Sequence, residues 1–386
     1  MTRLRWTTAG ESHGANLIGV LEGVPAGLAL DSQRIDRELV RRQGGYGRGG
    51  RMKIERDRVE ILSGLKGGLT IGSPIALRIP NKDDTIEKLP TPTNPRPGHA
   101  DLAGCQKYGM RDPRAVLERA SARETAMRVA VAGVARQVIE AFGIEIFAHV
   151  VSLGSVTVGP DVFERSGDAA AREARREASD FMSLDPEADG PMRAEVDRAK
   201  AGGDSLGGVF EVRAMGVVPG LGSYASGPER MTARIGGGLF SIPAMKGVEF
   251  GLGFESAERP GSQVHDPIVP ASGAPGAPWG RFGRDSNRAG GLEGGMTNGQ
   301  PIVVRVAMKP IPTLRQGIDT VDFESGESVR ATYQRSDVTS VPAASVVGEA
   351  MVALTLAEAF LEKFGGDSMD QVESTVAAYR GQLEAL

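Results

Sequence analysis

Residues 121–142 read SARETAMRVAVAGVARQVIEAF and give the clearest secondary-structure signal in the chain. Ser121 followed three residues later by Glu124 matches a capping box, a pattern that starts helices. The apolar residues behind it recur at helical spacing, at Met127, Val131, Val134 and Val138. This pattern predicts a helix that ends near residue 142. Asp112-Pro113 can begin an earlier helix, so we expect the chain to break near Ser121.

Strand patterns lie on both sides of this helix. Residues 4–31 contain apolar runs punctuated by Gly and Pro, which predicts strand, turn and strand. Asp31 then suits the N-cap of a helix over 32–43. Further strand patterns occur at 52–63, 207–222 and 302–308.

The remaining segments are surface helices, loops and one late helix. Residues 161–201 are charged and Ala-rich, which predicts two surface helices, and 343–364 has the pattern of an amphipathic helix. Residues 80–111 hold five prolines and 260–295 are rich in Gly and Pro, so both are expected to be irregular. Helices and strands interleave and no low-complexity linker divides them. We therefore expect one α+β domain over residues 1–386.

Composition excludes several classes of protein. The chain has 386 residues and a net charge of −4, which argues against a general nucleic-acid binder. A single cysteine, Cys105, excludes an internal disulfide framework and a Cys-rich zinc site, and four scattered histidines make no metal site. No secretory h-region and no run of about 18 apolar residues is visible. The expectation is a soluble cytoplasmic protein that spans no membrane.

Basic residues are concentrated near the N-terminus. Residues 34–58 contain nine basic and four acidic residues, a local charge of +5. The segment includes the Gly-rich loop GGYGRGG at 44–50. Gly lets the backbone approach a ligand closely, and Arg forks hold carboxylate and phosphate, so a small polyanion fits this loop. A solvated basic surface is the alternative.

Two short motifs suggest other functions. Residues 10–14, GESHG, match the G-x-S-x-G of a hydrolase nucleophile elbow at Ser12, although this motif normally follows several strands. The spacing Gly45-x-Gly47-x-x-Gly50 matches a dinucleotide fingerprint, but it follows a predicted helix rather than a strand. The same loop resembles an RGG element. A serine hydrolase and an RNA-binding module using 44–51 are therefore the rival hypotheses.

Several further segments offer proton donors or anion ligands. His13 lies on a Gly-flanked turn and His99 in the Pro-rich loop, and an imidazole titrates near neutral pH. Anion ligands are offered by Ser121-Ala-Arg123 at a helix start, by Lys309 to Thr313 and by Arg335-Ser-Asp337. Together these residues favour proton-transfer or elimination chemistry on a phosphorylated acid.

Segments along nearly the whole chain resemble the chorismate synthase family. The matching segments are TAGESHG (8–14), EGVPAGL (22–28), RRQGGYGRGGRMKIE (41–55), PRPGHAD (95–101), SARETAMRVA (121–130), KGVEFGLGFE (246–255), EGGMTNGQPIVVR (293–305), MKPIPTL (308–314) and RSD (335–337). The resemblance implies a single-domain β-α-β sandwich, with helices layered between antiparallel β-sheets. It also implies a homotetramer.

The resemblance also implies a reaction and a cofactor. The reaction is the anti-1,4-elimination of phosphate from 5-enolpyruvylshikimate 3-phosphate to give chorismate, the last shared step toward aromatic amino acids. It requires reduced FMN without net redox change. No reductase domain is evident, so a separate flavin reductase is expected; whether NADPH reduces the flavin on this chain stays open.

By the same resemblance, His13 protonates the departing phosphate, His99 protonates reduced flavin, and Asp337 works with the flavin to remove the ring proton. The implied substrate ligands are Arg42, Arg48, Ser121, Arg123 and Arg335. The implied FMN ligands are Ser121, Ala122, Arg123, Pro243, Ala244, Gly294, Lys309, Pro310, Ile311, Pro312, Thr313 and Arg335. Arg42 and Arg48 are alternatively assigned to NADPH. Pro243 stands where relatives often have Asn, so any flavin contact there must use a carbonyl or Ala244.

Overall fold

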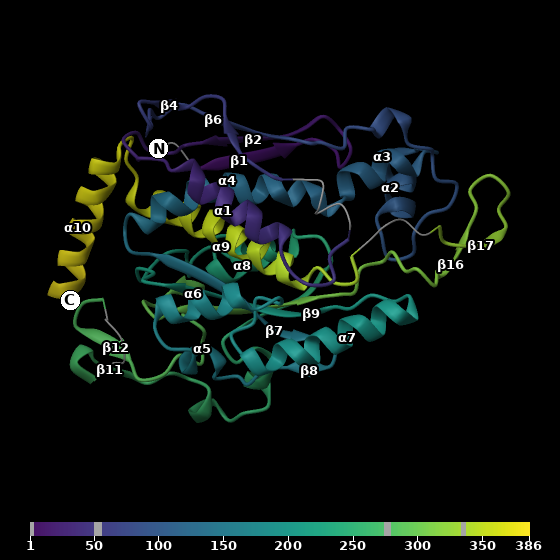
Figure 1. The fold of residues 1–386 in the computed structure, drawn as a ribbon. Coiled ribbons are helices and arrows are strands. Elements are labelled where there is room, and N and C mark those ends of the chain that lie inside the picture. Colours follow the sequence, from purple (N-terminus) through teal and green to yellow (C-terminus); the bar gives the residue numbers. More distant parts are fainter. Residues whose placement is uncertain (1–3, 50–55, 274–278, 333–336) are drawn as a thin grey trace.

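Two antiparallel sheets enclose a layer of helices in the computed structural model, which describes residues 4–49, 56–273, 279–332 and 337–386 (Figure 1). One sheet has the strand order β1-β2-β6-β3 and the other β10-β15-β9-β7-β8. Helix α4 packs on the first sheet and α9 on the second, and α4 and α9 pack against each other. The layered α+β arrangement expected from the sequence is therefore present.

The first sheet is built from strands that bury one face. Its strands are β1 (Arg5–Ala9), β2 (Asn16–Glu22), β6 (Ile75–Pro80) and β3 (Glu60–Ile61). Residues alternate between buried and partly exposed along β2, which places Leu17 and Leu21 in the core. A Cβ on Gly19 would lie 2.6 Å from Met127 Sδ, so glycine lets α4 approach this sheet closely.

The second sheet completes the other side of the core. It contains β7 (Glu145–Leu153), β8 (Val156–Thr157), β9 (Gly208–Met215), β10 (Met245–Phe250) and β15 (Ile302–Met308). The strands predicted at 207–222 and 302–308 are present as β9 and β15, which pair antiparallel. Alternate residues of β15 are buried, so this strand presents one face to the helices.

The helix predicted over 121–142 is present, but its α-helical part begins at Thr125 and not at Ser121. Helices α3 (Pro113–Ala120) and α4 (Thr125–Glu140) are separated at Ser121, as expected, and a short 3₁₀ turn, η3 (Ala122–Glu124), lies between them. Ser121 Oγ accepts from the Arg123 backbone N–H at 3.3 Å. Glu124 pairs with Arg128 instead of closing the capping box, because the first turn is 3₁₀.

The helix over 343–364 differs from its prediction. Helix α9 (Val341–Phe364) is buried around nearly its whole circumference, so it is a core helix and not an amphipathic one. It lies between α4, α8 (Met231–Phe240) and strands β7 and β9. Among the described residues it is the one helix long and apolar enough to cross a membrane, and 89% of its most apolar window is buried inside the protein.

Local signals elsewhere were partly correct. Helix α1 (Ser32–Gln43) has Asp31 as its N-cap, accepting from the Gln33 N–H at 2.8 Å, as predicted. The strand expected over 52–63 is reduced to β3, and residues 52–55 lie outside the described residues. The stretch 80–111 is not wholly irregular, because α2 (Asp101–Tyr108) forms after Pro97, where no proline follows until Pro113.

The other elements are short or lie at the surface. Three surface helices replace the two expected over 161–201, and short hairpins interrupt 260–295. The remaining α-helices are α5 (Val162–Arg165), α6 (Ala169–Ala178), α7 (Asp189–Gly202) and α10 (Met369–Ala385). The remaining strands are β4 (Leu65–Lys66), β5 (Leu69–Thr70), β11 (Ile268–Pro270), β12 (Phe282–Arg284), β13 (Leu292–Glu293), β14 (Met296–Thr297), β16 (Asp319–Val321) and β17 (Ser328–Arg330). Figure 1 shows α2, α3, β16 and β17 at one end of the molecule and α10 at the other.

Replacing Gly348 by alanine is expected to lower the free energy of unfolding by about 1–3 kcal/mol, a typical cost of overpacking a core. A Cβ at this position of α9 would lie 2.4 Å from Phe210 Cε2 on β9. Gly237→Ala in α8 is the matched control, since a Cβ there meets nothing within 4 Å. Denaturant unfolding should show loss of stability for Gly348→Ala and none for Gly237→Ala; equal effects would refute the packing explanation.

Candidate active site

An arginine cluster, which we define as Arg42, Arg48 and Arg123, pairs with two carboxylates: Arg42 and Arg123 with the buried Asp57, and Arg48 with Asp337. Arg42 Nη2, in the last turn of α1, and Arg123 Nη1, in η3, lie 3.1 and 2.7 Å from the same oxygen, Asp57 Oδ2. Burial lowers the pKa of Arg42 to about 10; Asp57 opposes this shift, and Arg123 and Arg48 add to it. Within the part of the chain that the structure describes, Arg42 Nε and Asp57 Oδ1 have no hydrogen-bond partner. The cluster carries more positive than negative charge, which suits an anionic ligand.

Asn81 connects this cluster to the GESHG turn. Its side-chain oxygen accepts from Arg123 Nε at 2.9 Å, and its amide nitrogen donates to the Gly14 carbonyl at 2.6 Å. Ser121 Oγ donates to Ser12 Oγ at 3.1 Å. A Cβ at Gly10, where φ is +109°, would lie 2.4 Å from the Asn16 carbonyl oxygen, so this turn requires glycine. The turn therefore lies against the start of η3.

His13 is held by a carboxylate from α3. Its backbone N–H donates to Glu118 Oε2 at 2.8 Å, and its ring Nδ1 lies 2.9 Å from Glu118 Oε1. Ring Nε2 lies 3.8 Å from Asp83 Oδ2. Burial alone would raise the pKa of Glu118, but the hydrogen bonds from His13 outweigh burial and lower it.

His99 is held in a similar way by α2. Ring Nδ1 lies 2.5 Å from Oδ1 of Asp101, the first residue of α2, and 2.9 Å from Arg96 Nη2. The Asp101 side chain is buried, and burial alone would raise its pKa. Hydrogen bonds from His99 and Arg96 outweigh burial and hold the pKa of Asp101 well below its usual range.

The loop at 309–313 meets the loop that carries His99. Lys309 Nζ donates to the Gly98 carbonyl at 2.8 Å, and Arg96 Nη1 lies 3.4 Å from Thr313 Oγ1. The Lys309 backbone N–H donates to the Ala244 carbonyl at 3.0 Å. Ala244 has φ of +74°, a left-handed conformation that costs an alanine about 1–2 kcal/mol. Burial, and next Lys246, lower the pKa of Lys309.

Asp337 joins the Gly-rich loop to the start of α9. It accepts from the Gly49 N–H at 2.5 Å and from Ser340 Oγ at 2.7 Å, and Arg48 Nε lies 3.3 Å from its Oδ2. The Arg48 side chain is only 9% exposed. The loop follows helix α1 and no strand, so the order required for a dinucleotide fingerprint is absent from its described part.

A family model described as "Chorismate synthase" matches residues 4–361. The chain is 53% identical to chorismate synthase of Desulforudis audaxviator, over 99% of this chain and 98% of that protein. It is 51% identical to chorismate synthase of Aquifex aeolicus, with the same coverage. A solved structure, "Crystal Structure of Chorismate Synthase", superposes with a TM-score of 0.80 at 44% identity, covering 100% of this chain and 99% of that one.

The chain belongs to the chorismate synthase family. The resemblance drawn from its motifs is confirmed, and so is the fold. Chorismate synthase is a lyase of the shikimate pathway, so the activity expected from the sequence is confirmed at that level. The hydrolase hypothesis fails on context as well, because the GESHG turn joins β1 to β2 and is not a strand-to-helix elbow.

Contacts in this chorismate synthase chain bring most of the predicted site residues into two groups. The first group is the arginine cluster with Ser121, which contacts Arg123, Asp337, which contacts Arg48, and His13, whose turn is joined to Arg123 by Asn81. The second group consists of His99, Ala244, Lys309 and Thr313. Helices α2 and α3, which hold the two histidines, pack on each other. Ala122 is exposed at the start of η3, and Pro243, Pro310, Ile311 and Pro312 flank residues of the second group.

Two predicted ligands are not brought in. Gly294 lies exposed in the turn between β13 and β14, and no hydrogen bond among the described residues ties it to either group. Arg335 lies outside the described residues.

The sequence analysis missed three residues that hold the site together, Asp57, Asn81 and Glu118, because their hydrogen-bond partners are distant in sequence.

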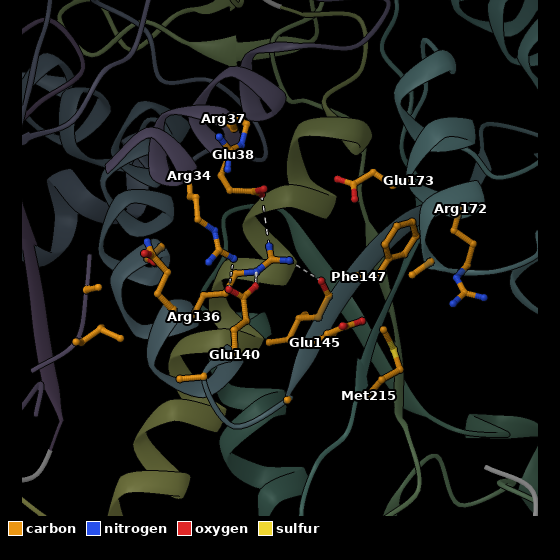
Figure 2. Close-up of a pocket in the computed structure, with 18 of the residues that line it drawn as sticks. Arg34, Arg37, Glu38, Arg136, Glu140, Glu145, Phe147, Arg172, Glu173 and Met215 are labelled. Atoms are coloured by element: carbon orange, nitrogen blue, oxygen red, sulfur yellow. Dashed lines mark hydrogen bonds and ion pairs between the residues drawn. The ribbon is translucent and has the colours of Figure 1, made fainter. Parts of the chain in front are cut away.

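A cavity of about 870 Å³ lies elsewhere, between α1, α4, α6 and β7. None of the predicted site residues line it. Figure 2 shows Arg136 between Glu38 and Glu140, and Arg34 also pairs with Glu140. Arg34, Arg136 and Arg176 of this cavity are paired with carboxylates. Among the described residues, no group of three His, Cys, Asp or Glu could hold a metal.

Proposed function

We propose that the arginine cluster and the GESHG turn form the pocket in which 5-enolpyruvylshikimate 3-phosphate loses phosphate. The observation that carries this proposal is the shared position of the two parts: Asn81 bonds both Arg123 and the Gly14 carbonyl. The substrate carries two carboxylates and a phosphate. Three guanidinium groups against two carboxylates, Asp57 and Asp337, supply forks for these groups.

The side chains divide the proton transfers between them. His13 donates a proton from Nε2 to the departing phosphate, since Nδ1 is held by Glu118. Asp337, an anion held by Gly49 and Arg48, takes part in removing the ring proton. His99, whose ring Nδ1 lies 2.5 Å from Asp101 Oδ1, is the proposed proton donor beside the second group.

The residues around His99 fit FMN. Lys309 and Thr313 provide a cation and a hydroxyl for a phosphate, and Ala244 provides backbone near them. Gly98 has φ of +78°, a left-handed conformation that favours glycine, and its position lies beside Lys309 Nζ and Pro312. Reduced FMN supplies electron density to the elimination that no side chain can supply. The other FMN ligands proposed from the family resemblance are Ser121, Ala122, Arg123, Pro243, Gly294, Pro310, Ile311, Pro312 and Arg335, of which Gly294 has no hydrogen bond to either group among the described residues and Arg335 lies outside them.

The source of the reduced flavin is proposed to be a separate reductase. Arg42 and Arg48 are buried and paired with Asp57 and Asp337, which favours a substrate role over an NADPH contact. We further propose that the protein is a cytoplasmic homotetramer of single-domain chains.

One hydrophobic core that runs from Leu4 to Val372 supports the single domain. Exposed apolar side chains that a second copy would cover support the oligomer, among them Tyr224, Phe254 and Ile268.

The test is anaerobic incubation of the protein with 5-enolpyruvylshikimate 3-phosphate and photoreduced FMN, followed by product absorbance. Product is expected with reduced FMN and none with oxidised FMN. Turnover with oxidised FMN, or without flavin, would contradict the proposed cofactor. NADPH with oxidised FMN and no reductase should give no product; product there would overturn the separate-reductase proposal.

Replacing Lys309 by alanine is expected to weaken FMN binding about 10- to 100-fold, because one charge-assisted hydrogen bond to phosphate contributes about 1.5–3 kcal/mol. Quenching of flavin fluorescence on titration with protein measures this affinity. Lys246→Ala is the matched control, since Lys246 is exposed and lies close enough to Lys309 to influence its pKa. Equal losses in both variants would show a general charge effect and not a contact by Lys309.

A further inference from the structure

Glu118 is a fully buried carboxylate whose part in the proposed chemistry has so far been only to bind Nδ1 of His13. Its side chain is 0% exposed. It lies on α3, the helix that precedes η3 and Arg123 in the chain. Its partners are the backbone N–H and ring Nδ1 of His13, and Arg114 Nη1 at 3.5 Å. A buried carboxylate is costly unless it is paired and hydrogen-bonded, so these contacts account for its burial.

The contacts decide which ring nitrogen of His13 carries a proton in the neutral form. An ionised carboxylate only accepts hydrogen bonds, so Nδ1 must donate to Glu118. The lowered pKa of Glu118 is consistent with an ionised group. The backbone N–H of His13 binds the other oxygen, Oε2, so one carboxylate holds both the ring and its main chain. The imidazole is 21% exposed and keeps Nε2 on the side opposite Glu118, toward Asp83.

We propose that Glu118 is the positioning residue of His13, fixing the ring so that Nε2 alone exchanges protons with the substrate. This rests on the proposed function, in which His13 is the acid. The imidazolium gives its Nε2 proton to the bridging oxygen as the carbon–oxygen bond breaks, and the bond electrons leave with phosphate. The ring remains neutral with its proton on Nδ1, donated to Glu118. A carboxylate behind a catalytic imidazole sets tautomer and orientation in the same way in hydrolase triads.

The second histidine shows that the arrangement is repeated. Asp101 Oδ1 lies beside His99 Nδ1 as Glu118 Oε1 lies beside His13 Nδ1, although Arg96 Nη2 also contacts this nitrogen of His99, and the two carboxylates lie on the packed pair α2 and α3. This pair is tightly joined, since a Cβ on Gly104 would lie 2.4 Å from Val116 Cγ1. One helix pair therefore orients both imidazoles.

The test combines kinetics with nitrogen NMR of protein labelled at its four histidines. In wild-type protein His13 should be the Nδ1–H tautomer when neutral. Glu118→Leu should populate the Nε2–H tautomer and lower kcat on the order of 10²-fold, with KM for substrate within about threefold. Glu118→Gln, whose amide oxygen still accepts from Nδ1, should keep the tautomer and recover part of kcat.

Separate outcomes overturn the two proposals. An unchanged His13 tautomer in Glu118→Leu, or unchanged kcat in both variants, would refute the positioning role. Full turnover in His13→Ala would instead refute the proposed function, whatever the tautomer. The His265 signals, from an exposed ring, should be identical in all proteins. If Glu118→Leu does not fold, Glu118→Gln decides by tautomer and kcat together: loss of the Nδ1–H tautomer with wild-type kcat, or its retention with kcat as low as in His13→Ala, would refute the inference.

Discussion

Alanine at position 13 or at position 99 is expected to lower kcat by about 10²- to 10⁴-fold, the usual contribution of a general acid or base. Each imidazole is the group that can move a proton in its part of the site. His13 is partly exposed beside Glu118, and His99 lies between Arg96 and Asp101. The measurement is turnover of 5-enolpyruvylshikimate 3-phosphate under anaerobic conditions with excess reduced FMN.

The two variants should stay folded, because neither imidazole belongs to the apolar core. Circular dichroism and the thermal midpoint check this. His265→Ala, at an exposed ring far along the chain, is the matched control and should keep wild-type turnover. Turnover in His13→Ala or His99→Ala equal to that of the control would remove the proton-transfer role of that histidine.

The parts of the fold that the sequence predicted correctly depend on neighbours in the chain. Asp31 caps α1 through a bond to Gln33, two residues away, and β15 shows its pattern in seven consecutive residues. The error at α9 has a physical reason. A helix with a polar side is buried all round when other elements pack on that side. For α9 these elements supply arginines that pair with Glu349.

The candidate site shows the same division. The motifs located His13 and Lys309, and the family resemblance gave them roles. The residues that hold them could not be found in this way. Glu118 lies 105 positions from His13 and Asn81 lies 42 positions from Arg123, and neither contact has a local pattern. The sequence offered one indication of Glu118: an acidic residue that directly follows the apolar Leu117 in a predicted helix, and Leu117 is buried.

Glu349 replaced by alanine is expected to lower the free energy of unfolding by about 3–5 kcal/mol, the cost of breaking a buried ion pair from one side. Its carboxylate, 2% exposed on α9, accepts from Arg41 Nη2 at 2.5 Å and from Arg176 Nη1 at 3.1 Å. It also accepts from the Ala148 backbone N–H at 2.7 Å. Removal leaves the buried Arg176 guanidinium, the half-buried Arg41 guanidinium and a strand N–H without this partner. Guanidinium chloride unfolding at pH 7 measures the loss.

Glu173→Ala is the matched control, because Glu173 also pairs with Arg176 but is 60% exposed. An exposed pair contributes about 0–1 kcal/mol, so a loss above 2 kcal/mol in the control would contradict the role of burial.

The stabilisation by Glu349 should also depend on pH in a fixed direction. Burial alone would raise the pKa of Glu349, but Arg41, Arg176 and Arg136 outweigh burial and lower it to about 2. An unfolded glutamate titrates near 4.3, so between these values the unfolded chain binds the extra proton. Stability from this group is complete above about pH 5 and is lost as pH falls toward 2. The difference in unfolding free energy between wild type and Glu349→Ala should therefore shrink over that interval. A constant difference down to pH 3 would mean that the carboxylate charge is not what stabilises α9 against α1 and α6.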